Sequence, residues 1–144
     1  MATLPVNDSG NIALNRAASA NSEQNGRPPS SGNDGDVQTR WCASSGTMPQ
    51  WWMVDFGSAA TVTNAQIVWQ HTVAYKYLIE VSPDNINWTL AVDKRANSMS
   101  GQITSDNFSA RGRYLRVLIT GSEQKAWSSF YELRAFGSIN GHGK

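Results

Sequence analysis

Residues 33–40 hold the clearest set of side chains that could do chemistry. They read Asn-Asp-Gly-Asp-Val-Gln-Thr-Arg, which places Asp34, Asp36 and Thr39 close together around Gly35, a residue suited to a tight turn. Calcium takes six to eight hard oxygen ligands from carboxylates, carbonyls and hydroxyls, and one such loop can supply all three kinds. The same residues also suit an ordinary turn in which Asp caps backbone amides, so spacing alone leaves both interpretations open.

Catalytic chemistry has few candidates in this sequence. The chain has two histidines, one of them His142 near the C-terminal end, and a single cysteine, Cys42. An enzyme needs a nucleophile with a base, two facing carboxylates or a metal with an open position. The closest acidic pair, Asp34 and Asp36, is better suited to calcium, and a glycosidase pair built from other carboxylates stays open on the sequence alone. We therefore expect no catalytic residues and no enzyme activity, and we read Cys42 as a small buried hydrophobe.

Composition narrows the classes of partner. The formal net charge is +1, without a basic or acidic run, so we expect no nucleic-acid partner. One cysteine allows no internal disulfide. No stretch approaches about 18 apolar residues, so we expect no transmembrane helix, and the polar N-terminus lacks the apolar core of a signal peptide. Because the chain begins and ends like an excised module, we expect the export signal to lie upstream in a parent protein.

The elements that must position these residues are short strands. In residues 113–120, Leu115, Val117 and Ile119 share one face and alternate with Tyr114 and Arg116 on the other. Turn residues separate many of the segments that alternate in this way. The pattern predicts an all-β fold, a jelly-roll β-sandwich of about eight antiparallel strands. The predicted strands cover residues 12–18, 51–56, 61–69, 75–82, 89–93, 101–108, 113–120 and 131–136.

We expect one folded domain at residues 11–137. Residues 1–10 read as a linker or chain end and residues 138–144 as a flexible tail, because both are mostly small and polar. Residues 19–50 are rich in Pro, Gly and polar side chains and show no strand pattern, so they should form ordered loops of the kind that often serve a function.

Six motifs in sequence order resemble discoidin or coagulation factor 5/8 type C domains, and above all the carbohydrate-binding modules of family 32 from bacterial glycan-degrading enzymes. Together they span nearly the whole expected domain. They are Asn-Ile-Ala-Leu-Asn-Arg-Ala at 11–17, Asp-Gly-Asp with Thr-Arg-Trp at 34–41, Gln-Trp-Trp-Met-Val-Asp-Phe-Gly at 50–57, Tyr-Leu-Ile-Glu-Val-Ser-Pro-Asp at 77–84, Arg-Tyr-Leu-Arg-Val at 113–117 and Glu-Leu-Arg-Ala-Phe-Gly at 132–137.

The resemblance implies a jelly roll with a structural calcium ion near the sugar-binding end. Carried over by position, the ligands are the carbonyl oxygens of Ser31, Asp36 and Tyr131, the carboxylates of Asp34 and Glu132, and the carbonyl and hydroxyl oxygens of Thr39. Glu132 lies far along the chain from Asp34, so the ion would tie the last strand to the first loops.

The resemblance also implies a sugar site on variable loops at one end of the sandwich. A pyranose offers an apolar CH face and a ring of hydroxyls, so such sites pair an exposed aromatic with a few polar groups. Trp127 is the expected stacking platform, with burial in the core as the alternative. Further candidates in the matching loops are His71, Glu23, Arg95, Tyr75, Gln70 and Asn97. We expect Trp41, Trp51, Trp69 and Trp88 to be core residues, and the direction of Trp52 is left open.

The function implied is a non-catalytic carbohydrate-binding module. It would target a parent secreted or cell-surface glycan-degrading enzyme, in the same chain, to an oligosaccharide or polysaccharide of galactose, mannan or amino-sugar type. The chain is expected to act as a monomer without binding membranes. The alternative is a discoidin-type adhesion domain that binds phospholipid or protein, which the near-neutral charge disfavours for anionic lipid.

Overall fold

The computed structural model describes residues 9–139. Residues 1–8 of the expected linker at 1–10, and residues 140–144 of the expected tail at 138–144 with His142 among them, lie outside the described residues. The described chain is built from seven strands and two short 3-10 turns. The strands are β1 (Ala17–Ala20), β2 (Trp41–Cys42), β3 (Gln50–Val73), β4 (Tyr75–Ser82), β5 (Thr89–Asp93), β6 (Gly101–Ser122) and β7 (Ser129–Ile139), and the turns are η1 (Pro29–Gly32) and η2 (Glu123–Lys125). Among the described residues, no helix has the length and hydropathy needed to cross a membrane.

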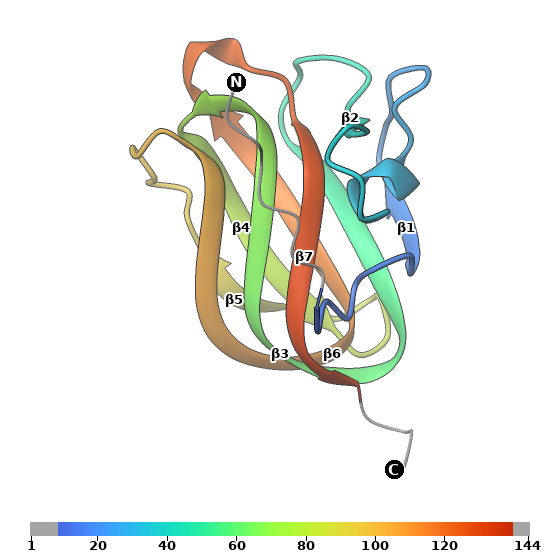
Figure 1. Cartoon of the computed structure of the whole chain (residues 1–144). Helices are drawn as coiled ribbons and strands as arrows, with labels where there is room; N and C mark the ends of the chain where they lie inside the picture. Colours follow the sequence, from blue (N-terminus) through green and yellow to red (C-terminus); the bar gives the residue numbers. More distant parts are fainter. Residues whose placement is uncertain (1–8, 140–144) are drawn as a thin grey trace.

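The strands form a two-layer antiparallel sandwich, as expected (Figure 1). One layer contains β1, the first half of β3, the second half of β6, β4 and β5. The other contains β2, β7, the second half of β3 and the first half of β6. β3 and β6 run through both layers, which is why all strands belong to one hydrogen-bonded sheet.

The two long strands differ from the prediction of four separate ones. The segments predicted at 51–56 and 61–69 are both part of β3, and those at 101–108 and 113–120 are both part of β6. Asp55 pairs with Tyr114 on one side of the corner and Ala60 with Gly112 on the other, with a register shift between them. The turn residues at 57–58 therefore bend the ladder without ending it.

The predicted first strand is displaced. Residues 12–15 form a turn, and β1 begins at Ala17, because side-chain amides take up the local backbone groups. The Asn11 Oδ1 atom accepts from Ala13 N, and Asn33 Nδ2 donates to the carbonyl oxygens of Ala13 and Arg16. At the other end, β7 continues to Ile139, so the predicted tail begins inside the sheet.

The core lies between the layers. The alternation predicted at 113–120 is confirmed, since Leu115, Val117 and Ile119 are fully buried. At one end of the core, the ring of Phe130 on β7 lies 5.3 Å from Trp41, 5.3 Å from Trp52 and 5.9 Å from Trp69. These are the ends of the strands that carry the candidate binding loops, so the loops rest on a packed aromatic cluster.

An ion pair between Arg113 and Asp55 braces the corner where β3 meets β6. Arg113 donates to both carboxylate oxygens, at 2.8 and 3.0 Å. The pKa of Asp55 is lowered, mainly by the hydrogen bonds from Arg113. Burial opposes this shift, and the hydrogen bond from Gly57 N–H adds to it. A lowered folded-state pKa stabilises the fold above the unfolded value of about 3.9, and the gain disappears as pH falls through the folded pKa.

We expect Arg113→Gln to lower the free energy of unfolding at pH 7 slightly, because the ion pair is partly exposed and screened by water. The difference between the variant and the unmodified chain should shrink between pH 4 and pH 2. Denaturant unfolding at several pH values measures this. A difference that stays constant down to pH 2 would show that the Asp55 carboxylate does not carry the effect.

Candidate functional site

The loop of residues 33–40 folds back on the buried carboxylate of Glu132. Glu132 is fully buried on β7, and its Oε2 atom accepts a hydrogen bond of 2.9 Å from Gly35 N. Gly35 has a φ of +78°, the left-handed conformation that the turn requires. This hydrogen bond joins the last strand to the first loops across 97 positions of sequence, and the calcium ion expected to tie them stays a prediction.

Oxygen atoms crowd together within the loop. The Thr39 hydroxyl lies 2.6 Å from Asp34 Oδ2 and 3.1 Å from the carbonyl oxygen of Asp36. Asp34 Oδ1 also accepts from Asp36 N at 3.0 Å. Carboxylate, carbonyl and hydroxyl oxygens thus meet around Thr39. The same loop also has the capped backbone amide of an ordinary turn.

These residues fit a hard cation such as calcium. Asp34 and Glu132 would supply the carboxylates, and Asp36 and Thr39 would supply carbonyl and hydroxyl oxygens. Ser31 is in η1, which packs against β7, and Tyr131 is the residue before Glu132 on that strand. Within residues 9–139 no three His, Cys, Asp or Glu side chains gather as a metal cluster, and a calcium ion in this loop would need backbone and hydroxyl oxygens as well as carboxylates.

A second group of residues lies at the end of the sandwich drawn uppermost in Figure 1. Loops 21–27 and 43–49, the turn between β3 and β4, and residues 123–128 all reach this end (Figure 1). Backbone hydrogen bonds join them, from Gln24 N to Cys42 O, from Ala43 N to Ser128 O and from Glu123 N to Ala74 O. Segments from four places in the sequence thus form one continuous surface.

Trp127 is exposed on this surface, as predicted, with 38% of its surface accessible. Its indole edge lies against Gly46, where an added Cβ atom would be 2.9 Å from Trp127 Nε1. The turn before it contains two non-glycine residues in the left-handed region, Gln124 at φ 59° and Lys125 at φ 55°. Such conformations cost about 1–3 kcal/mol each and gather at ligand sites, where the surrounding structure enforces them.

The other expected sugar ligands are placed less uniformly. Gln70 and His71 are half-buried in the last residues of β3, so they belong to a strand end and not to a loop. Glu23 is exposed on the neighbouring loop 21–27. These three residues and Trp127 share the same end of the molecule.

Tyr75 is a correction to the predicted site. Its side chain is 1% exposed, so it cannot offer its ring or hydroxyl to a ligand. The ring stacks on Trp69 at a centroid distance of 4.1 Å, and the hydroxyl donates to the carbonyl oxygen of Trp127 at 3.0 Å. Tyr75 therefore holds the backbone of the loop that carries Trp127 from the interior of the protein.

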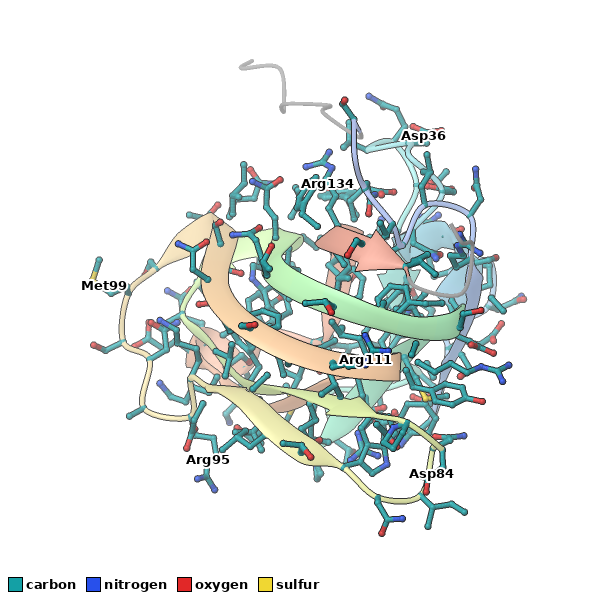
Figure 2. All side chains as sticks on the ribbon, turned by 90° about the horizontal axis from the view of Figure 1, so that it is seen from below. Asp36, Asp84, Arg95, Met99, Arg111 and Arg134 are labelled. Carbon is teal, nitrogen blue, oxygen red and sulfur yellow. The ribbon has the colours of Figure 1, made fainter. Side chains whose placement is uncertain are left out.

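Asn97 and Arg95 are occupied with local structure. Asn97 Nδ2 donates to Tyr75 O at 2.9 Å, and its carbonyl accepts from Lys76 Nζ. The Arg95 guanidinium forms two hydrogen bonds to Asp93, and these are the main cause that lowers the pKa of Asp93 to about 2. Figure 2 shows Arg95 on the opposite side of the molecule from Asp36. Neither prediction gains support from these contacts.

The burial of the tryptophans outside the site differs in part from the prediction. Trp41 and Trp69 are fully buried, as expected, but so is Trp52, while Trp51 is only partly buried. Trp88 is not a core residue either, because it is only partly buried. Its ring lies under the guanidinium of Arg116, with 4.0 Å between Arg116 Cζ and the ring centroid. Sequence reasoning missed the contact of Gly46 with Trp127, because only the proximity of Gly46 to the folded indole distinguishes it from other loop glycines.

Comparison with known proteins is consistent with this geometry. The F5/8 type C domain family matches residues 17–133. No protein with a curated description is significantly similar to the sequence.

Among the solved structures that share the fold are three carbohydrate-binding modules. Chitosan-binding module 1 of a chitosanase/glucanase from Paenibacillus sp. IK-5 is 32% identical with a TM-score of 0.80, over 88% of this chain and 98% of that one. Module 2 of the same enzyme, in complex with chitotriose, is 27% identical with a TM-score of 0.81, over 88% and 100%. The CBM32 of AlyQ, in complex with 4,5-unsaturated mannuronic acid, is 26% identical with a TM-score of 0.73, over 85% and 95%.

Proposed function

The chain belongs to the F5/8 type C domain family, and from this premise we propose that it is a non-catalytic carbohydrate-binding module whose site is centred on Trp127. Solved structures that resemble it are carbohydrate-binding modules, as the motifs predicted. The observation that carries the proposal is a tryptophan 38% exposed on a loop that neighbouring loops hold in place. A flat indole with polar neighbours matches the apolar face and the hydroxyls of a pyranose.

Among the expected ligand types, an amino sugar is best supported. Two chitosan-binding modules resemble the chain at 32% and 27% identity. Glu23 and Glu123 lie on segments at the Trp127 end, where a carboxylate could form a charge-assisted hydrogen bond with the ammonium group of glucosamine. Half-buried His71 at the end of β3 is the polar group proposed to meet a ring hydroxyl.

Titration calorimetry with glucosamine and N-acetylglucosamine oligosaccharides tests the proposal. We expect dissociation constants in the micromolar to millimolar range, and tighter binding of the charged series. Preference for the acetylated series would remove the carboxylates from the mechanism. Absence of binding to either series, or release of reducing ends by the purified chain, would contradict the proposed function.

The biological role follows from tethering. As a monomeric module of a secreted or cell-surface enzyme, the chain would raise the concentration of substrate near a catalytic domain in the same protein. Its own part would be recognition alone.

We also propose that the module holds a structural calcium ion. Asp34, Thr39 and Glu132 would be the central ligands, with carbonyl oxygens from Ser31, Asp36 and Tyr131. The crowding of Asp34, Asp36 and Thr39 oxygens supports this. When bound, the ion would supply a positive charge that ties the loop to β7.

The adhesion alternative has less support. Its lipid-binding form would need apolar side chains gathered at one tip, but the two most exposed, Ile86 and Met99, are on separate loops at 77% each. Figure 2 shows Met99 and Asp84, next to Ile86 in its hairpin, on different sides of the molecule.

We expect no sedimentation with vesicles of phosphatidylserine and phosphatidylcholine at 0.15 M salt, because the near-neutral chain has little attraction for anionic lipid. Co-sedimentation that weakens with added salt would favour the adhesion function. Vesicles of phosphatidylcholine alone serve as the control.

A further inference from the structure

The loop that carries Trp127 is held by hydrogen bonds to its backbone. Ser122 Oγ donates to Ala126 O at 2.6 Å, and Ala126 N donates to Glu123 O at 3.3 Å. On the other side of Trp127, Ser128 O accepts from Ala43 N. The carbonyl of Trp127 itself is bound by a side chain from beneath, the hydroxyl of Tyr75 at 3.0 Å.

Tyr75 is well suited to hold this carbonyl in place. It is the first residue of β4, 1% exposed, and its ring is fixed by the stack on Trp69, with 13° between the planes. Burial is the main cause that raises the pKa of Tyr75 above its usual value, with a smaller contribution from Cys42 and an opposing one from the His71 backbone. The hydroxyl therefore stays protonated and remains a donor through the physiological pH range.

The direction of the indole depends on the backbone at Trp127. The preceding residues Gln124 and Lys125 are in the left-handed region, a conformation that persists only where surrounding contacts enforce it. Without the Tyr75 hydroxyl, the Trp127 carbonyl would lose its buried donor and could turn toward water. The fraction of molecules with the indole ready for a sugar would fall, and the apparent affinity would fall by the same factor.

We propose that Tyr75 is a positioning residue for the sugar site: its buried hydroxyl orients Trp127 through the main chain and contacts no ligand. This inference rests on the proposed function, because it assumes that Trp127 stacks on the ligand. It reassigns a residue that the sequence suggested as a direct contact.

The chain offers a matched control in Tyr77. Tyr77 is also 1% exposed, also lies on β4 and also contacts Trp69, at 5.4 Å, but its hydroxyl donates to Asp106 on β6. Tyr75→Phe and Tyr77→Phe each remove one buried hydroxyl, so both should lower the melting temperature. Only Tyr75→Phe should act on the binding site.

The binding test is calorimetry with glucosamine oligosaccharides on the unmodified chain, Tyr75→Phe, Tyr77→Phe and Trp127→Ala. We expect Tyr75→Phe to weaken binding by about threefold to tenfold, the net worth of one hydrogen bond, and Tyr77→Phe to leave it unchanged. If Trp127→Ala reduces binding while Tyr75→Phe binds like Tyr77→Phe, the positioning role is wrong and the proposed function stands. If Trp127→Ala has no effect, the placement of the sugar site is wrong.

A second measurement tests the positioning role without any ligand. In protein labelled with 5-fluorotryptophan, the fluorine spectrum has one line for each of the six tryptophans, and Trp127→Phe assigns the line of interest. We expect Tyr75→Phe to shift or broaden the Trp127 line and Tyr77→Phe to leave it in place. An unchanged Trp127 line in Tyr75→Phe would overturn the inference, whether or not the chain binds sugar.

Discussion

Replacement of Trp127 by alanine should weaken binding of glucosamine oligosaccharides by about 30-fold, or about 2 kcal/mol. The indole is the large aromatic at the loop-bearing end that both faces solvent and is fixed by its neighbours. Its removal would leave the polar groups nearby without an apolar surface against which to hold a sugar ring. Calorimetry at matched temperature and salt measures the loss.

The fold should survive this change, because the Trp127 side chain is outside the aromatic cluster around Phe130. Trp88→Ala is the matched control, since it removes a partly buried tryptophan that contacts Arg116 and lies apart from the site. Both variants should keep the far-ultraviolet circular dichroism of the unmodified chain. Equal affinity of Trp127→Ala and Trp88→Ala for the oligosaccharide would remove Trp127 from the site.

Calcium should raise the melting temperature by about 10 °C when its free concentration is about 1,000 times the dissociation constant. Ligand binding to the folded state alone gives about 4 kcal/mol at that ratio, and for a domain of about 150 residues each kcal/mol corresponds to about 2–4 °C. The ion would bridge the loop at Asp34 to Glu132 on β7, a connection that the unfolded chain does not make. Thermal unfolding in calcium and in excess chelator measures the difference.

Asp34→Ala should abolish this difference, and Asp36→Ala should preserve it. The Asp36 carboxylate accepts a hydrogen bond from Gln38 N, and only the Asp36 carbonyl, which alanine retains, is assigned to the ion. Each variant loses hydrogen bonds in the loop, so the readout is the calcium-dependent shift and not the absolute melting temperature. An unmodified chain that melts at the same temperature in calcium and in chelator would refute the proposed ion.

Much of the scaffold could be predicted because it depends on local pattern. The alternation of Leu115, Val117 and Ile119 identifies a strand with one buried face wherever that strand is placed. The same logic fails for Trp51 and Trp52, because a run of apolar residues gives no sign of which face is inside. The pairing of β3 with β1 and β6 decides it, by burying Trp52 and leaving Trp51 toward the outer face.

The sequence by itself determined the all-β class, the family, the loop that carries the Asp-Gly-Asp turn and the choice of Trp127 as an exposed aromatic. Only the tertiary structure decided that Gly35 N donates to Glu132, that β3 and β6 bend through both layers, and that Tyr75 lies beneath Trp127. The physical reason is range: turns and alternation arise from neighbouring residues, whereas these contacts join residues 52 and 97 positions apart. Such pairs become neighbours only after the two layers close on a common core.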